Sequence, residues 1–197
     1  MVAYIPAYER GNVLVGLARC FTQPYDPTTP PALPEDTVAL AGTWSTPWVP
    51  VGATEEGMSF SASRDTQDIK IEEQPNPVDK RQTSASYTMA LTLAEDTMHT
   101  MVLSYGGSIT ITAAGTTTPG IQQLNMSSDL SYFAFAFEGR APSGFWRRVL
   151  VPIVVSVGEA ETAYRRAEEK RMYKVSFESL VRPEDVIIRE MTTVPTG

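Results

Sequence analysis

The chain has 197 residues, of which 42% are hydrophobic and 20% charged, so it has enough apolar side chains for a folded core. Its formal net charge of -7 argues against a general DNA-binding surface, because phosphate affinity depends on clustered Lys and Arg. No apolar run reaches the roughly 18 residues of a membrane-spanning helix, so we expect no membrane partner.

The first long irregular segment is rich in proline. Seven prolines fall between Thr22 and Pro50, where apolar residues show little periodicity. We therefore expect an excursion from the core over about residues 22–50, within one domain that spans residues 1–197.

Alternating apolar residues dominate the rest of the chain and predict strands. The clearest pattern is residues 84–93, where apolar and small polar side chains alternate. Shorter patterns predict strands over 58–63, 69–72, 109–111, 133–138 and 173–177. The run 149–157 is almost continuously apolar, which predicts a strand covered on both faces.

One helix interrupts the strands. Thr97 is a candidate N-cap, Gly106 is a candidate stop, and an apolar stripe with helical spacing lies between them: Met98, Met101, Val102 and Tyr105. Residues 159–171 have helical spacing too, but they also fit an extended run into the next strand. The predicted fold is mainly β, an antiparallel sandwich or barrel with one flanking α-helix.

Reactive side chains are scarce. The single histidine, His99, is expected on the exposed side of the helix as a solvated side chain. The single cysteine, Cys20, excludes an intrachain disulfide and is expected to be buried and inert. We therefore expect no catalysis, no cofactor and no metal site.

The basic residues are unevenly distributed. Residues 82–139 contain no Lys or Arg, whereas residues 140–190 hold ten of the sixteen basic residues and eight acids. The pairs Arg147-Arg148 and Arg165-Arg166 hint at nucleic acid, but nearby glutamates favour salt bridges instead. This distribution has two interpretations: ordinary variation along the surface, or different neighbours for the weakly charged and the mixed-charge parts of the chain.

The order of motifs between residues 48 and 107 resembles a known family. The segment Val51-Gly52-Ala53-Thr54-Glu55-Glu56-Gly57 runs into an alternating strand. It is followed by Arg64-Asp65, Ile69-Lys70-Ile71-Glu72-Glu73, Val78-Asp79, a Ser/Thr strand, Leu91-Thr92-Leu93-Ala94-Glu95-Asp96-Thr97 and Gly106-Gly107. This order is similar to that of the major tail proteins, or tail tube proteins, of long-tailed bacteriophages, especially those of actinobacteria.

The resemblance implies a structural virion protein. Members of this family form hexameric rings that stack into a hollow tube, through which DNA passes without specific binding during ejection. Their inner sheets pair edge to edge, and a long hairpin or loop reaches a neighbouring subunit. By position, residues 64–83 are that projecting loop here. The implied partners are further copies and other tail proteins, assembled in the bacterial host cytoplasm.

Two sets of residues follow from the resemblance. The expected lumen-facing residues are the polar alternates Ser84, Ser86, Thr88 and Thr92. The expected subunit contacts are Arg64, Asp65, Lys80, Arg81, Arg147 and Arg148. A lumen without Lys or Arg from residues 82–139 would not hold phosphate, so DNA would slide.

A β-sandwich module that binds carbohydrate or a receptor is the alternative. In that case Trp44, Trp48 and Trp146 would form a stacking platform. Trp44 and Trp48 are four residues apart, so they would share one face of a strand.

Overall fold

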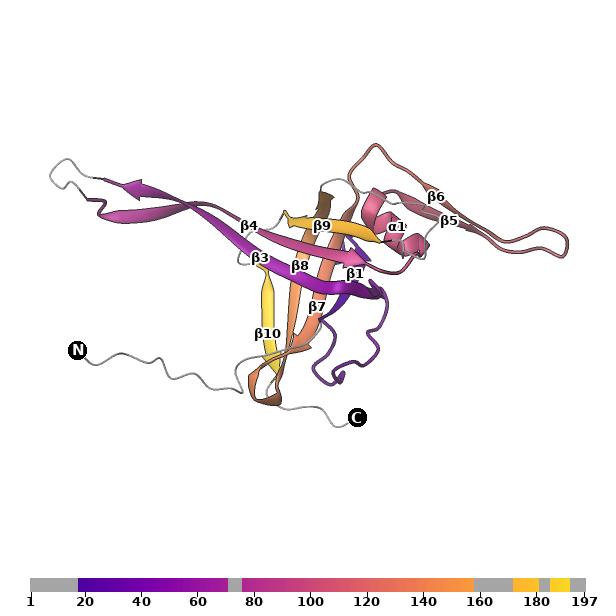
Figure 1. Cartoon of the computed structure of the whole chain (residues 1–197), viewed down its shortest axis with the longest axis horizontal. Helices are drawn as coiled ribbons and strands as arrows, with labels where there is room; N and C mark the ends of the chain where they lie inside the picture. Colours follow the sequence, from indigo (N-terminus) through magenta and orange to yellow (C-terminus); the bar gives the residue numbers. More distant parts are fainter. Residues whose placement is uncertain (1–17, 71–75, 158–171, 181–184, 192–197) are drawn as a thin grey trace.

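The computed structural model describes residues 18–70, 76–157, 172–180 and 185–191. Within these residues the chain consists mainly of antiparallel strands with one α-helix, α1 (Met98–Tyr105), which confirms the predicted fold class (Figure 1). The segment 159–171, for which the sequence allows a helix or an extended run, lies outside the described residues.

The large sheet has eight strands in the spatial order β2-β1-β7-β8-β9-β4-β3, with β10 also paired to β8. In chain order these are β1 (Arg19–Pro24), β2 (Val49–Pro50), β3 (Thr54–Ile69), β4 (Asp79–Leu93), β7 (Tyr132–Arg140), β8 (Trp146–Val157), β9 (Tyr173–Ser179) and β10 (Ile187–Met191). Strand β8 pairs with β7 on one side, and on the other with β10 near its start and β9 near its end. The sheet divides at this point, so β9, β4 and β3 run across β7 and β8 as a second layer (Figure 1).

The main core lies between these two layers. Alternate residues of β4 and β9 point into it, as the period-2 pattern predicts, and meet aromatic residues of β7. The ring centroids of Phe135 and Phe177 are 5.4 Å apart, and those of Phe60 and Phe137 are 5.5 Å apart. The buried strand residues of this core are Cys20, Met89, Leu91, Leu93, Phe133, Phe135, Val151, Val154, Tyr173, Val175 and Phe177.

Helix α1 has the bounds that the sequence predicts. The hydroxyl of its N-cap, Thr97, accepts from the backbone N–H of Thr100, and the Thr100 hydroxyl accepts from the N–H of Thr97. Gly106 ends the helix with a φ of +76°, and its N–H donates to the carbonyl of Val102 at 2.8 Å. Val102 and Leu103 anchor the helix in the main core.

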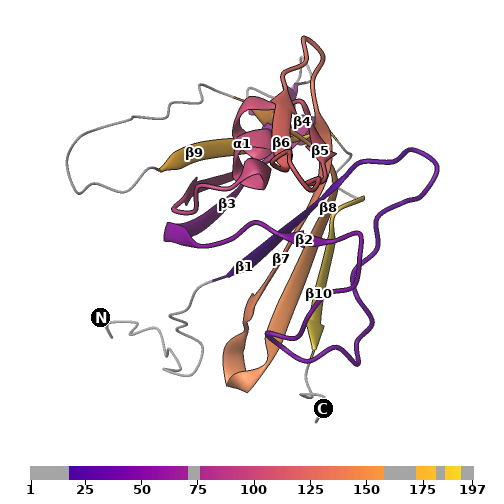
Figure 2. The ribbon, with the colours of Figure 1, turned by 90° about the vertical axis from the view of Figure 1, so that its right-hand side faces the viewer.

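The proline-rich segment lies over the outer face of β1, β7 and β8 (Figure 2). It forms a second core with these strands, whose buried members are Phe21, Trp44, Trp48, Ala134, Ala136 and Leu150. Trp44 stacks on Phe21 with 3.9 Å between ring centroids, and Trp48 Nε1 donates to the carbonyl of Ala32 at 2.9 Å. Strand β8 is therefore covered on both faces, as its apolar run predicts.

A buried ion pair ties this segment to the sheet. Arg148 and Glu138 are opposite in register, both side chains are 0% exposed, and Arg148 Nε lies 3.3 Å from Glu138 Oε2. Arg148 also donates to the carbonyls of Glu35 and Val38, at 3.1 and 2.6 Å. Glu138 Oε1 accepts from Arg19 at 2.9 Å. The prediction that Arg148 is a subunit contact is therefore wrong, because its charge is paired inside the subunit.

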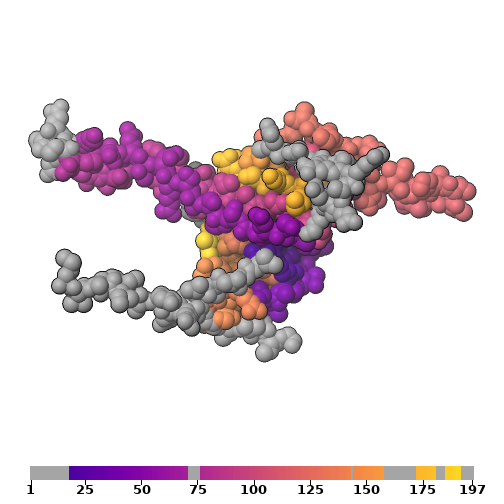
Figure 3. Space-filling view, in the orientation of Figure 1, coloured from indigo at the N-terminus to yellow at the C-terminus, as the bar shows by residue number. Residues whose placement is uncertain are grey.

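Two hairpins project from the sandwich in opposite directions (Figure 3). One is the outer part of β3 and β4, which are 16 and 15 residues long. The strands predicted over 58–63 and 69–72 therefore belong, as far as residue 69, to one continuous strand. Alternation fails between them because, among the described residues, no core lies behind the projecting part. The second hairpin is a separate two-stranded sheet of β5 (Ser108–Thr112) and β6 (Ile121–Asn125).

Candidate functional site

Small polar side chains line the outer face of β3, β4 and β9. Cross-strand register places them in rows that we call the small-polar face: Ser59–Ala90–Ser176, Ser61–Thr88–Glu178 and Thr92–Lys174. The residues between these rows point the other way, and Met89 and Leu91 are buried in the main core. One face of this sheet is therefore apolar and packs into the main core, and the other face is polar and exposed to solvent.

The predicted lumen residues fall into two places. Thr88 and Thr92 lie on the small-polar face, and Ser86 continues it outward along β4. Ser84 lies farther along the hairpin, where its hydroxyl donates to the Asp65 carboxylate at 2.6 Å. Three of the four residues thus share the face that fits a lumen, and the fourth belongs to the projecting part.

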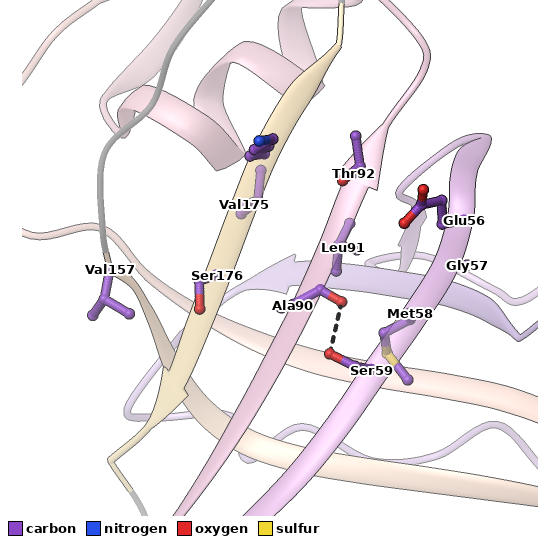
Figure 4. A pocket seen from close by; sticks show the side chains of 11 residues that line it. Glu56, Gly57, Met58, Ser59, Ala90, Leu91, Thr92, Val157, Val175 and Ser176 are labelled. Carbon is purple, nitrogen blue, oxygen red and sulfur yellow. Dashed lines mark hydrogen bonds between the residues drawn. The ribbon is translucent and has the colours of Figure 1, made fainter.

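A depression of about 450 Å³ lies over the same strands (Figure 4). Its lining comes mostly from β3, β4 and β9: Glu56, Gly57, Met58, Ser59, Ala90, Leu91, Thr92, Val157, Lys174, Val175 and Ser176. Inside it the Ser59 hydroxyl donates to the carbonyl of Ala90 at 3.4 Å. Most of the side chains that line it are short, and Glu56 and Lys174 are the long exposed exceptions.

The small-polar face also carries charge that comes from β9. Lys174 is exposed and lies opposite Thr92 in register. The expectation of a face without Lys or Arg is therefore wrong, because β4 pairs with a strand from the mixed-charge part of the chain. Exposed carboxylates of Glu56 and Glu178 accompany the lysine, so the net charge near this face is small and negative.

The projecting part of the first hairpin, residues 64–69 and 79–85, is rich in charge, and we call it the charged extension. The predicted contact residues within it are all exposed: Arg64, Asp65, Lys80 and Arg81. Lys80 Nζ lies 3.5 Å from Asp68 Oδ1, an exposed pair of the kind that stabilises little. Arg64 and Arg81 have no ion-pair partner among the described residues, so their guanidinium groups are available to another chain.

Arg147 lies on the face of β8 opposite to Arg148, as adjacent residues of a strand do. It is exposed and forms an ion pair with Glu190 of β10, which is its partner in register. Both side chains are partly accessible, 47% and 36% exposed. Arg147 therefore stays available as a surface residue, in contrast to its neighbour.

Strand β3 is the last strand of the large sheet, so one of its edges has no neighbour among the described strands. Pairing of β4 with β9 covers Thr88–Leu93 only. Beyond that point the hairpin is two-stranded, and both of its edges are open in the described part of the chain. Open edges present unpaired N–H and C=O groups that can pair with another chain.

The three tryptophans do not form an exposed platform. Trp44, Trp48 and Trp146 are 5%, 7% and 1% exposed. Trp44 and Trp48 lie in the proline-rich segment outside any strand, and their rings meet edge to face at 5.5 Å. The predicted stacking surface is therefore wrong, because this segment folds onto the sheet and buries the rings.

The two isolated reactive side chains are packed against the core. His99 is half-buried, not solvated as predicted, because its side of α1 meets β1: its Nε2 lies 3.0 Å from the Thr22 hydroxyl. Burial lowers the pKa of His99. Cys20 is buried, as predicted, and burial raises its pKa to about 12. A thiol with this pKa is a poor nucleophile near neutral pH.

No group of three or more His, Cys, Asp or Glu residues could hold a metal ion in the described ranges. No helix there has the length and apolar character to cross a bilayer. Comparisons with protein-family models and with curated proteins find no match to this sequence. The surfaces described above are therefore the basis for a functional proposal.

The alternation patterns do not predict that β5 and β6 project as a hairpin. The signal that points to it is a combination of charge and hydropathy. Residues 97–128 contain no Asp, Glu, Lys or Arg, yet several large apolar side chains within that span are exposed: Ile109, Ile111, Ile121 and Met126. An uncharged stretch with exposed isoleucines is typical of a surface that contacts another molecule.

Proposed function

We propose that the chain is a structural subunit that forms hexameric rings, and that these rings stack into the hollow tail tube of a long-tailed bacteriophage. Genomic DNA passes through the lumen without specific binding, and other tail proteins are the remaining partners. Assembly takes place in the cytoplasm of the bacterial host. The observation that carries the proposal is a two-faced antiparallel sheet whose open terminal strand continues into a long projecting hairpin.

The open edge of β3 supports assembly through strand pairing. An exposed edge of 16 residues is an aggregation hazard in a monomer. When the sheets of several copies pair edge to edge around a ring, they close into a barrel in which every strand edge is hydrogen-bonded to a neighbour. The small-polar face would then line the channel. Its mostly short side chains and small net charge suit a channel along which phosphates slide without being held.

The charged extension supports contact with a neighbouring copy. It reaches beyond the body of the subunit, where the described part of its own chain provides no layer to pack against (Figure 1). Arg64 and Arg81 are exposed there together with Asp65 and Asp79. Paired charges of both signs set the register and orientation of an interface more than they add affinity.

Negative-stain electron microscopy of the purified full chain across a concentration series tests the proposal. We expect six-fold rings or hollow tubes above a threshold concentration. Monomers at every concentration contradict the assignment.

Truncation of the charged extension tests its role. Residues 64–85 are replaced by Asn-Gly, which joins the paired residues Ser63 and Ser86 through a tight turn. The residues of both cores are retained, so we expect a folded subunit that does not polymerise. Its urea unfolding transition, compared with that of the full chain, checks the fold. Normal tubes from a folded truncated chain would show that the extension is not an assembly contact.

A further inference from the structure

The β5–β6 hairpin, which we call the uncharged ribbon, has two chemically different faces. Register pairs Ile109 with Leu124 and Ile111 with Gln122 on one face. On the other face the polar side chains bond to one another: Gln123 Nε2 donates to Asn125 Oδ1 at 2.6 Å, and Asn125 Nδ2 donates to Thr110 Oγ1 at 2.8 Å. This second face also carries one isoleucine, Ile121, which pairs with Thr112 at the end of the ladder and is 53% exposed. The hydrogen-bonded part of the face is suited to water, whereas the isoleucine face is not.

The isoleucine face is covered by the described part of its own chain only at its base, where Leu124 packs against the main core. Ile111 is 70% exposed and Ile109 is 37% exposed. Only the base of the ribbon approaches the body, where it meets α1, and the remainder points away (Figure 1). An isolated two-stranded hairpin is marginally stable in water, so a partner on this face would stabilise it.

A groove of about 450 Å³ elsewhere on the molecule has matching chemistry. The proline-rich segment, β8 and the start of β10 form it, and its lining is largely apolar: Tyr25, Asp26, Pro27, Pro30, Pro31, Leu150, Pro152, Ile153, Asp185 and Ile187. Proline side chains are rigid, so the groove loses little entropy when it is filled. We call it the proline groove.

Two carboxylates make the proline groove selective for ligands that carry no negative charge. Asp26 and Asp185 are exposed, and hydrogen bonds from the side chain and backbone of Thr28 lower the pKa of Asp26. An acidic occupant would be repelled, whereas the uncharged ribbon has no carboxylate. Gln122, on the same face as Ile111, provides an amide N–H₂ that can donate to these oxygens.

We propose that the uncharged ribbon of one copy docks its isoleucine face into the proline groove of a second copy. The ribbon points away from its own body, so it enters the groove of another molecule. The two surfaces are different patches of one chain, and such a head-to-tail contact repeats from copy to copy and closes a ring or extends a filament. This inference rests on the proposed function, to which it adds a second assembly contact besides the charged extension.

Charge substitutions on the two ribbon faces test the contact. Ile111→Glu places a carboxylate in the acid-lined groove, and we expect the concentration needed for assembly to rise about tenfold or more. Ile111→Lys should weaken assembly less, because Asp26 and Asp185 attract it. Thr110→Glu is the matched control, since it adds the same charge to the water-facing side one residue away. Equal effects of Thr110→Glu and Ile111→Glu would overturn the proposal.

Cross-linking identifies the occupant. Ile111→Cys and Ile187→Cys are made in separate full-length chains, mixed and treated with a short bis-maleimide. The native Cys20 is buried, so it contributes little background. We expect a cross-linked dimer only in the mixture. A cross-link of Ile111→Cys with itself would show that ribbons contact each other and would overturn the groove.

The same experiment separates the two proposals. Rings or tubes without the mixed cross-link would overturn ribbon docking and leave the tube assignment standing. Mixed cross-links between chains that never form rings or tubes would support ribbon docking and contradict the tube assignment.

Discussion

Arg147 and Arg148 are adjacent in β8 and allow a matched pair of substitutions to methionine. Arg148→Met removes the cation from an ion pair in which both side chains are 0% exposed. The carboxylate of Glu138 then remains buried, with Arg19 as its one ion-pair partner among the described residues, and the carbonyls of Glu35 and Val38 lose their donor. Methionine keeps most of the apolar volume, so the change mainly tests charge and hydrogen bonding.

The expected losses differ severalfold. Removing one partner of a buried ion pair costs about 3–5 kcal/mol, because the other charge stays desolvated. We therefore expect Arg148→Met to lower the free energy of unfolding by about 4 kcal/mol, a large part of the roughly 5–15 kcal/mol of an ordinary domain. Arg147→Met breaks a pair whose side chains are 47% and 36% exposed, and such pairs contribute about 0–1 kcal/mol.

Urea unfolding, monitored by tryptophan fluorescence, measures the loss of unfolding free energy in both variants. With a slope of about 2 kcal/mol per molar urea, the Arg148→Met midpoint should fall by about 2 M and the Arg147→Met midpoint by less than about 0.5 M. The double variant Arg148→Met/Glu138→Leu should recover much of the loss, because no buried charge is left unpaired. Equal losses for the two single variants would refute the reading of Arg148 as an internal anchor.

Three further predictions concern single residues. Burial lowers the pKa of His99 below its ordinary value of 6.5, so the unfolded chain binds the proton more readily and the folded state loses stability as the pH falls below 6.5. The difference between the urea midpoints at pH 7.5 and pH 5.5 should therefore be smaller for His99→Gln than for the natural chain. Cys20, with a pKa raised to about 12, should react with a maleimide at pH 8 only after urea unfolding; reaction at similar rates in both states would contradict its burial. Both Gly107 and Gly144 have positive φ, but a Cβ at 107 would lie 2.2 Å from the carbonyl oxygen of Asn125, whereas a Cβ at 144 would meet nothing within 4 Å. Gly107→Ala should therefore lower the urea midpoint more than Gly144→Ala, and equal midpoints would argue against the close approach.

The fold class and helix α1 could be predicted because their signals are local. Alternation over residues 84–93 reports which side chains face the core, and it holds where β4 pairs with β9 and packs over aromatic residues of β7. Thr97 and Gly106 mark the helix ends through hydrogen bonds within a few residues. The length of β3 could not be predicted, because its outer part has no core and therefore no alternation to read.

The sequence predicts the exposure of the site residues less well, because the burial of a side chain depends on segments that are distant in the chain. Arg147 and Arg148 look alike as a basic pair, yet a strand directs adjacent residues to opposite faces. Since β8 is covered on both faces along much of its length, one of the two arginines, Arg148, is buried beneath a covering layer. That layer is the proline-rich segment, whose position no periodicity reveals. The same segment buries Trp44 and Trp48, which removes the platform of the alternative binding module.

The two projecting hairpins differ in the chemistry that each offers to a partner. The charged extension presents Arg64, Asp65 and Arg81, whose attraction to opposite charges is screened by salt. The uncharged ribbon presents Ile109 and Ile111, whose contacts depend on removing apolar surface from water. The two contacts should therefore respond differently to salt. If both proposals hold, added salt should weaken the contact of the charged extension and leave docking of the uncharged ribbon largely intact, because screening acts on charges and not on apolar burial.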